Sequence, residues 1–268
     1  FEVEQAFQNY AIILLVILLV SAFIFFRWYA KFEEQKQSEP LNLGQILSKI
    51  KEKKQFFTVY FISILASSIP AALIIFFVRD RLQLEEYTGV FLLAYFLSGA
   101  ASMVLWQKIS RKSDKITAWG YSMLVAVITF IWAFFIREGD FTAYLVICIA
   151  SGIAFGAELA LPPSILADLV HQDESGNNAA TSNYSAMGFL MKSGLAIATG
   201  AILPLLDASG FEPGKENSET ALFYLSFYYA LVPCIIKLCA AFLLYKWSKN
   251  KGVQDGEKNF NYRSDYVS

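Results

Sequence analysis

Four charged residues stand inside long apolar runs of this sequence, and they are the first candidates for chemistry. They are Glu158, Asp168, Lys192 and Lys237. If these runs lie in a bilayer, a charge near its centre costs at least about 2.5–3.5 kcal/mol, so one that persists usually faces a cavity or a partner. A lysine in such a cavity could bind substrate hydroxyls or the carboxylate of a coupling site.

The elements that must position these charges are membrane helices. Of the 268 residues, 56% are hydrophobic and only 17% are charged, against about 25% charged in soluble domains. Alternation at period two is absent over the apolar runs, which favours helices over a transmembrane barrel. We expect an all-α membrane protein. Its seven transmembrane helices are predicted at residues 9–26, 56–78, 87–107, 116–136, 141–170, 182–206 and 220–245.

Depth along these helices relates the four charges to one another. At about 1.5 Å per residue, Glu158, Lys192 and Lys237 lie about 18, 15 and 13 Å from the inner ends of their helices, whereas Asp168 stays near its inner end. A pair between Glu158 and Lys192 is therefore geometrically possible. A plainer interpretation remains open for both lysines: a buried ion pair, or a snorkelling side chain that only packs helices.

Small and helix-breaking residues accompany the charges. Gly152 and Gly156 form a Gly-x-x-x-Gly pattern, and further glycines punctuate the 182–206 run. Small faces let membrane helices approach closely. We expect Pro162-Pro163 to interrupt the 141–170 helix beside Glu158. A broken membrane helix is tolerated only where its freed backbone groups lie beside a cavity or other protein. This combination is typical of transporters.

The distribution of Lys and Arg predicts the orientation. One set of alternate loops and the carboxyl-terminal tail carries sixteen basic residues, and the opposite set carries four. Basic loops tend to stay in the cytoplasm, so the amino terminus is expected outside and the carboxyl terminus inside. The apolar residues Leu43, Ile46, Leu47 and Ile50 share one helical face among lysines. They predict an amphipathic helix, which would either touch anionic lipid or connect two halves in water.

Several function classes find no support in the residues. The formal net charge is −1 and offers no general attraction for nucleic acid. The three cysteines fall in apolar runs without a Cys/His cluster, so no metal site is expected. His171 is the only histidine, and no catalytic motif is present. We therefore expect neither an enzyme nor a bound cofactor.

A resemblance to a known family rests on three segments. They are Phe155-Gly156-Ala157-Glu158, Pro162 to Asp168, and Tyr184-Ser185 followed by Lys192-Ser193-Gly194. Together they resemble the glycoside-pentoside-hexuronide:cation symporters, which are melibiose-permease-like members of the major facilitator superfamily. The resemblance covers essentially the whole chain, as helices 6–12 of a twelve-helix transporter.

This resemblance implies a division of the chain. Residues 1–26 would be the last helix of the amino-terminal half, 27–55 the cytoplasmic linker, 56–246 the carboxyl-terminal six-helix half and 247–268 a cytoplasmic tail. The chain would then be a fragment that depends on the missing amino-terminal half. The protein would be a multi-pass protein of the plasma membrane, which is the inner membrane in bacteria.

The resemblance also implies roles for individual residues. Lys192, Glu158 and Tyr184 would serve substrate binding or coupling, and Asp168 with Arg111 would serve gating near the cytoplasmic surface. The implied activity is Na⁺- or H⁺-coupled symport of a sugar or glycoside, with the carboxylates that bind the coupling ion in the missing half.

Two other functions stay open at this point. Aromatic residues such as Trp106, Trp119 and Trp132 could stack on a sugar or line a lipid path equally well, so a transporter of a lipid-like or drug-like amphiphile is the first alternative. A retinal-binding seven-helix protein with Lys237 as the Schiff base is a distant one. Its counter-ion is not supplied by the second, third or fourth span.

Overall fold

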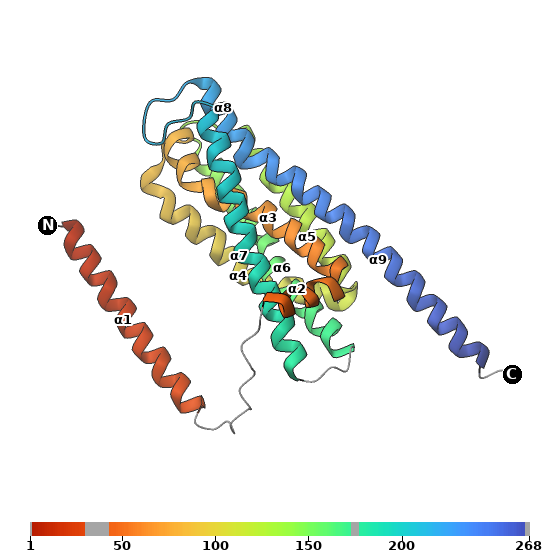
Figure 1. Cartoon of the computed structure of the whole chain (residues 1–268). Helices are drawn as coiled ribbons and strands as arrows, with labels where there is room; N and C mark the ends of the chain where they lie inside the picture. The colour runs from red at the N-terminus through yellow and green to blue at the C-terminus, as the bar shows by residue number, and fades with distance from the viewer. Residues whose placement is uncertain (1, 30–42, 173–176, 266–268) are drawn as a thin grey trace. The chain divides into compact units, whose positions relative to one another are not determined.

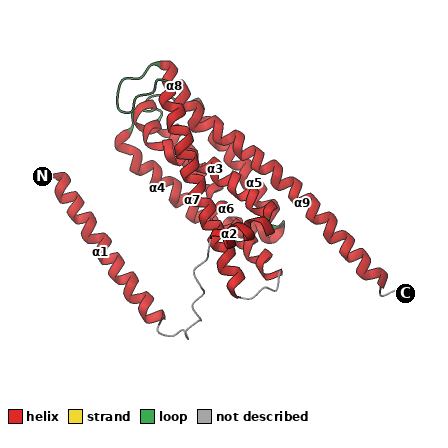
Figure 2. Cartoon of the chain, in the orientation of Figure 1, coloured by secondary structure: helices red, strands yellow, loops and turns green. Residues whose placement is uncertain are grey.

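The computed structural model describes residues 2–29, 43–172 and 177–265, and these residues form helices and short connections without a strand (Figure 2). The chain divides into two units, Phe1–Pro40 and Leu41–Ser268. The first unit contains α1 (Glu2–Tyr29), which includes the first predicted span. Within α1, Leu14–Arg27 is an apolar helical stretch.

The second unit contains six helical segments that are long and apolar enough to cross a membrane, and each coincides with one of the remaining predicted spans. Three of them join a helix to a short turn: Lys54–Arg81 contains α3 (Lys54–Phe76) and the π-helical turn η1 (Phe77–Arg81), Glu85–Lys112 contains the 3-10 turn η2 (Glu85–Tyr87) and α4 (Thr88–Lys112), and Lys115–Phe134 contains α5 (Lys115–Phe130) and the 3-10 turn η3 (Ile131–Phe134). Two lie within single helices: Phe141–His171 in α6 (Phe141–Gln172) and Ala180–Ala208 in α7 (Asn177–Ala208). The last, Glu219–Lys249, contains α8 (Glu219–Ser226), the π-helical turn η4 (Phe227–Leu231) and the first part of α9 (Val232–Asp265). The expectation of an all-α membrane protein is confirmed.

The axes of the long helices in this unit are roughly aligned, and successive helices point in opposite directions (Figure 1). α8 lies at one end of the bundle and α2 (Leu43–Glu52) toward the other (Figure 1). The side chains of Ile46 and Ile50 in α2 pack against buried residues of the bundle. Leu47 of the same helix is 58% exposed. The linker helix is therefore anchored by part of its apolar face, while Leu47 remains uncovered.

The expected interruption at Pro162-Pro163 is wrong. The helix α6 continues through both prolines from Phe141 to Gln172. Each proline removes one backbone N–H, which deprives the carbonyl four residues earlier, at Glu158 or Leu159, of its helical donor. Membrane helices tolerate such losses when local geometry and neighbours compensate. Glu158 therefore lies on a continuous helix, one turn before the proline pair.

Close packing of α6 on α4 follows the glycine pattern. A Cβ added to Gly152 would overlap Ser98 Oγ and the carbonyl oxygen of Tyr95. A Cβ added to Gly156 would overlap Ser102 Oγ and the carbonyl oxygen of Gly99 on α4. The absence of these Cβ atoms lets the two backbones approach. The expectation of a small-residue helix contact is confirmed here.

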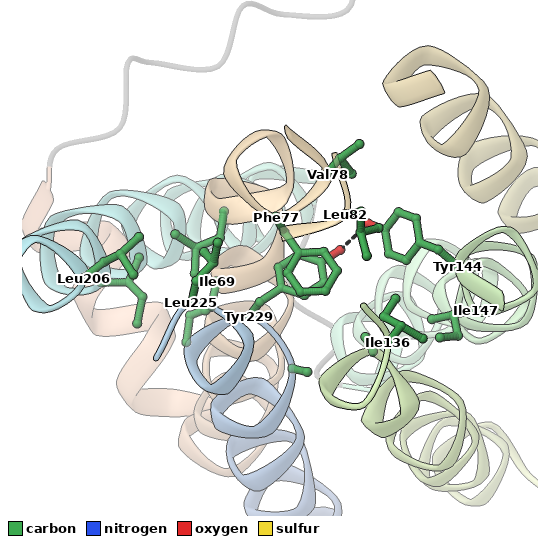
Figure 3. Close-up of a cluster of buried hydrophobic side chains, with 14 of the residues drawn as sticks. Ile69, Phe77, Val78, Leu82, Ile136, Tyr144, Ile147, Leu206, Leu225 and Tyr229 are labelled. Atoms are coloured by element: carbon green, nitrogen blue, oxygen red, sulfur yellow. Dashed lines mark hydrogen bonds between the residues drawn. The ribbon is translucent and has the colours of Figure 1, made fainter. Parts of the chain in front are cut away.

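A buried cluster joins the two π-helical turns. Phe77 in η1 stacks on Tyr229 in η4, with ring centroids 4.0 Å apart and an interplanar angle of 9°. The Tyr229 hydroxyl is 2.6 Å from the hydroxyl of Tyr144 on α6, and both residues are buried (Figure 3). These contacts tie α3, α6 and the last span together at one end of the bundle.

Candidate functional site

Glu158 on α6 is the centre of a buried polar cluster. Ser63 Oγ donates to Glu158 Oε1, and Ser67 Oγ donates to Glu158 Oε2 at 2.8 Å. Both serines lie on α3, four residues apart, so their side chains share one helical face. The carboxylate therefore receives hydroxyl donors on both of its oxygens.

Lys237 on α9 completes the cluster. Its ammonium Nζ forms an ion pair with Glu158 Oε1 and donates to Ser67 Oγ at 2.8 Å. It also lies 3.0 Å from Ser63 Oγ and 3.2 Å from the Ser63 carbonyl oxygen. The side chains of Lys237 and Glu158 are 8% and 9% exposed. Two opposite charges are thus removed from solvent where α3, α6 and α9 meet.

The pair borders a cavity of about 390 Å³ inside the six-helix unit. This volume falls in the range of pockets that hold small molecules, roughly 300–1,000 Å³. Residues of α3, α4, α5, α6, η4 and α9 line it, and most of their side chains are apolar. Its polar groups include Ser67, Glu158, Lys237, Tyr95 and Tyr229. An apolar pocket with a few convergent polar groups is the usual form of a small-molecule site.

The pair between Glu158 and Lys192, which depth alone made possible, does not form, and Glu158 pairs with Lys237 instead. Lys192 lies on an exposed part of α7, and no hydrogen bond or ion pair joins it to another side chain in the described part of the chain. Gly194 faces Ile64 of α3, and Lys192 points about 160° away from it around the helix at 100° per residue. The depth estimate was compatible with either lysine, and the direction of the side chain decided between them.

Tyr184 also lies apart from this cluster. Its hydroxyl donates to the carbonyl oxygen of Pro163 at 3.1 Å, which links α7 to α6. The residue is 41% exposed, and it does not line the cavity. Lys192 and Tyr184 therefore belong to the outer surface of this unit, and only Glu158 of the three expected site residues lies in the buried cluster.

The two expected gating residues have different surroundings. Asp168 pairs with Lys115 at 2.6 Å between Nζ and Oδ2, which connects the end of α6 to the first residue of α5. Arg111 is exposed near the end of α4. The acid near the predicted inner surface therefore has a lysine partner at the start of α5.

Ser63, Ser67 and the tyrosine pair were missed at the sequence level. The one signal for the serines was their spacing of four residues within a charge-free span, which places two hydroxyls on one helical face. No group of three or more His, Cys, Asp or Glu residues able to hold a metal occurs in the searched, described residues. The cluster is built from one carboxylate, one ammonium and hydroxyls.

A comparison with protein-family models matches residues 3–250 to the family described as MFS/sugar transport protein. The chain belongs to this family. The match supports a secondary transporter of the major facilitator superfamily, a small-molecule substrate and a multi-pass membrane protein. A comparison with curated proteins gave no match.

Membership in the MFS/sugar transport family also bears on the alternatives. It favours a transporter over an enzyme and over the retinal-binding protein. Lys237 has a carboxylate partner, Glu158 of the fifth predicted span, so it is the family match that disfavours the retinal-binding protein. The resemblance to the melibiose-permease-like members stays a prediction.

Proposed function

We propose that this protein is a cation-coupled symporter that moves a sugar or glycoside by alternating access. The observation that carries the proposal is the buried Glu158–Lys237 pair beside the cavity. A buried ion pair is poor evidence for stability because desolvation offsets most of its attraction. Ionisable residues inside a membrane more often serve a solute or ion pathway.

The coupling ion is Na⁺ or H⁺, and it acts on charges such as these. When a cation or proton binds near the pair, it weakens the attraction between Glu158 and Lys237. The ion pair and hydrogen bonds that hold α3, α6 and α9 together then change as well. In transporters that alternate access, rigid halves rock around a midplane site. A change in the contacts between helices of one half therefore couples ion binding directly to that movement.

The outer face of α7 supplies the second part of the proposed site. Lys192 and Tyr184 are exposed on this unit, and we propose that they meet substrate or a coupling carboxylate of the amino-terminal half. Asp168 and Arg111 act as gating residues near the cytoplasmic surface in this proposal. The Asp168–Lys115 contact supports an ionic latch there, because it joins two helix ends and is only partly buried.

An amphiphile transporter is the second candidate. It is favoured by the lining of the cavity, in which apolar residues such as Ile74, Phe96 and Phe130 outnumber the polar ones. Such a lining accepts an acyl chain as readily as the face of a sugar ring.

Uptake assays on the full-length gene product decide between the two candidates. We expect a labelled glycoside to accumulate in cells, and accumulation to collapse when the gradient of the coupling ion, sodium or proton, is removed while the other gradient is kept. Glu158→Gln should abolish accumulation at normal expression. Uptake of amphiphiles without glycosides would favour the second candidate, and glycoside uptake that ignores both gradients would contradict coupling.

Lys192 is tested separately in the same assay. As a cation that meets substrate or a carboxylate of the amino-terminal half, it is needed for its charge, so Lys192→Met should lose coupled uptake although the apolar stem and volume are preserved. Normal uptake by this variant at normal expression would remove Lys192 from the site and leave it a packing residue.

A further inference from the structure

The surroundings of the Lys237 ammonium are those of a bound cation. Four oxygens lie around Nζ: Glu158 Oε1, Ser63 Oγ, Ser67 Oγ and the Ser63 carbonyl oxygen. A lysine ammonium has three protons to donate, so the oxygens outnumber the hydrogen bonds it can make singly. We call these four atoms the oxygen cage.

The chemistry of the oxygen cage suits a small monovalent cation. A carboxylate, hydroxyls and a backbone carbonyl are hard ligands, and hard cations prefer oxygen-only sets. The cage contains one formal negative charge, on Glu158, which balances one positive charge. Among the residues that line the adjoining cavity, Glu158 and Lys237 alone are charged, so no second acid is present there to favour a divalent ion.

The cavity gives the ammonium somewhere to go. Lys237, Glu158 and Ser67 all line it, and so do Ser122, Ser151 and Tyr95, whose hydroxyl oxygens can accept hydrogen bonds from an ammonium that withdraws from the cage. The lysine stem is flexible, with four carbons between the backbone and the charge. An ion that arrives through the cavity meets the same oxygens.

We propose that the oxygen cage is a sodium site that the Lys237 ammonium fills in this conformation, and that sodium binds there when Lys237 withdraws. This inference rests on the proposed function, and it adds a sodium site in this half of the transporter to the coupling-ion carboxylates expected in the missing half. Sodium and the ammonium compete for the same oxygens, so each bound ion implies a different position of Lys237.

The test is a thermal-unfolding titration of the purified full-length protein in sodium chloride against choline chloride of equal ionic strength. Lys237→Ala empties the cage and leaves the Glu158 carboxylate to be balanced by sodium. Because a ligand that binds only the folded state raises its stability, we expect sodium to raise the melting temperature of this variant on the order of 5 °C more than that of the unchanged protein. A sodium site elsewhere in the protein cancels in this difference.

Two control variants test whether the extra sodium shift comes from the oxygen cage. Lys237→Ala combined with Glu158→Gln should lose the extra sodium shift, because the negative charge is gone. Lys215→Ala, which also takes a lysine away from a glutamate but in an exposed loop, should show no extra shift. If Lys237→Ala does not fold, the titration uses Lys237→Gln, whose amide can still donate to Glu158.

A measurement on the unchanged protein covers the case in which neither variant folds. Withdrawal exposes the Lys237 amine to the cavity, so its labelling by a membrane-permeant amine reagent should rise with sodium and not with choline. The proposal is overturned if the folded variant shows no extra sodium shift, or, where no variant folds, if the labelling is the same in both salts. These readouts report binding, so a failed site leaves the uptake assay to judge the proposed function independently.

Discussion

At the scale of the residue, a substitution in the buried tyrosine pair measures how much an unpartnered buried hydroxyl lowers the stability of the fold. Tyr144→Phe removes the 2.6 Å partner of the Tyr229 hydroxyl while the ring of residue 144 is retained. Tyr229 is 2% exposed, so we expect its unpartnered hydroxyl to cost about 1–3 kcal/mol of stability. Thermal or denaturant unfolding in detergent measures this change in the free energy of unfolding.

The double variant Tyr144→Phe with Tyr229→Phe is the matched control. Replacing both partners leaves no orphaned hydroxyl, so this protein should be more stable than Tyr144→Phe alone. Equal losses in the single and double variants would mean that the hydroxyl pair contributes nothing specific to this cluster.

Lys237 and Lys192 illustrate the same rule for charges. A lysine buried in a helix bundle must replace its lost hydration with protein groups. Lys237 does so with four oxygens, whereas Lys192 remains on the exposed part of α7 and is not desolvated by this unit. Two lysines at similar predicted depth therefore differ in burial and in their contacts.

At the scale of the element, the contact between α4 and α6 positions Glu158. Gly156 lies two residues before Glu158, and a Cβ there would overlap Ser102 Oγ and the Gly99 carbonyl oxygen. Backbone atoms cannot give way without moving a helix, so Gly156→Ala should cost about 1–3 kcal/mol through overpacking. The melting temperature of the purified variant measures this loss.

Gly188 provides the comparison on another membrane helix. No atom lies within 4 Å of a Cβ built on this glycine of α7. Alanine is the better helix former by up to about 1 kcal/mol, so Gly188→Ala should leave stability unchanged or raise it. A loss as large as that of Gly156→Ala would show that the effect is general to glycine in these helices and not due to the contact with α4.

At the scale of the whole molecule, the distribution of basic residues predicts which loops face the cytoplasm. Lys112 at the end of α4 and Lys215 in the loop before α8 lie in loops assigned to opposite sides. Single cysteines at these positions, in a background with the exposed Cys239 replaced by serine, should react differently with an impermeant thiol reagent on intact cells. We expect position 215 to be labelled from outside and position 112 only after permeabilisation.

Position 51 in α2 serves as a second cytoplasmic probe and should behave like position 112. Labelling of either from the outside in intact cells would reverse the orientation, and with it the assignment of Asp168 and Arg111 to a cytoplasmic gate.

The sequence alone determined the class of fold and the extent of six membrane-spanning segments. Uninterrupted apolar runs of about 20 residues leave the backbone little choice but to form helices in lipid. It also singled out Glu158 and the Gly152–Gly156 contact, because a charge in such a run and small residues one turn apart are visible without knowledge of neighbours.

Only the tertiary structure decided what Glu158 binds. Depth follows from counting residues, but the direction of a side chain turns by about 100° per residue, and the packing of each helix sets which side faces the bundle. That packing selected Lys237 over Lys192, brought Ser63 and Ser67 to the carboxylate, and paired Asp168 with Lys115. The same packing left the cavity of about 390 Å³ beside the pair. These contacts join residues 53–174 positions apart, where no local pattern in the sequence records which faces meet.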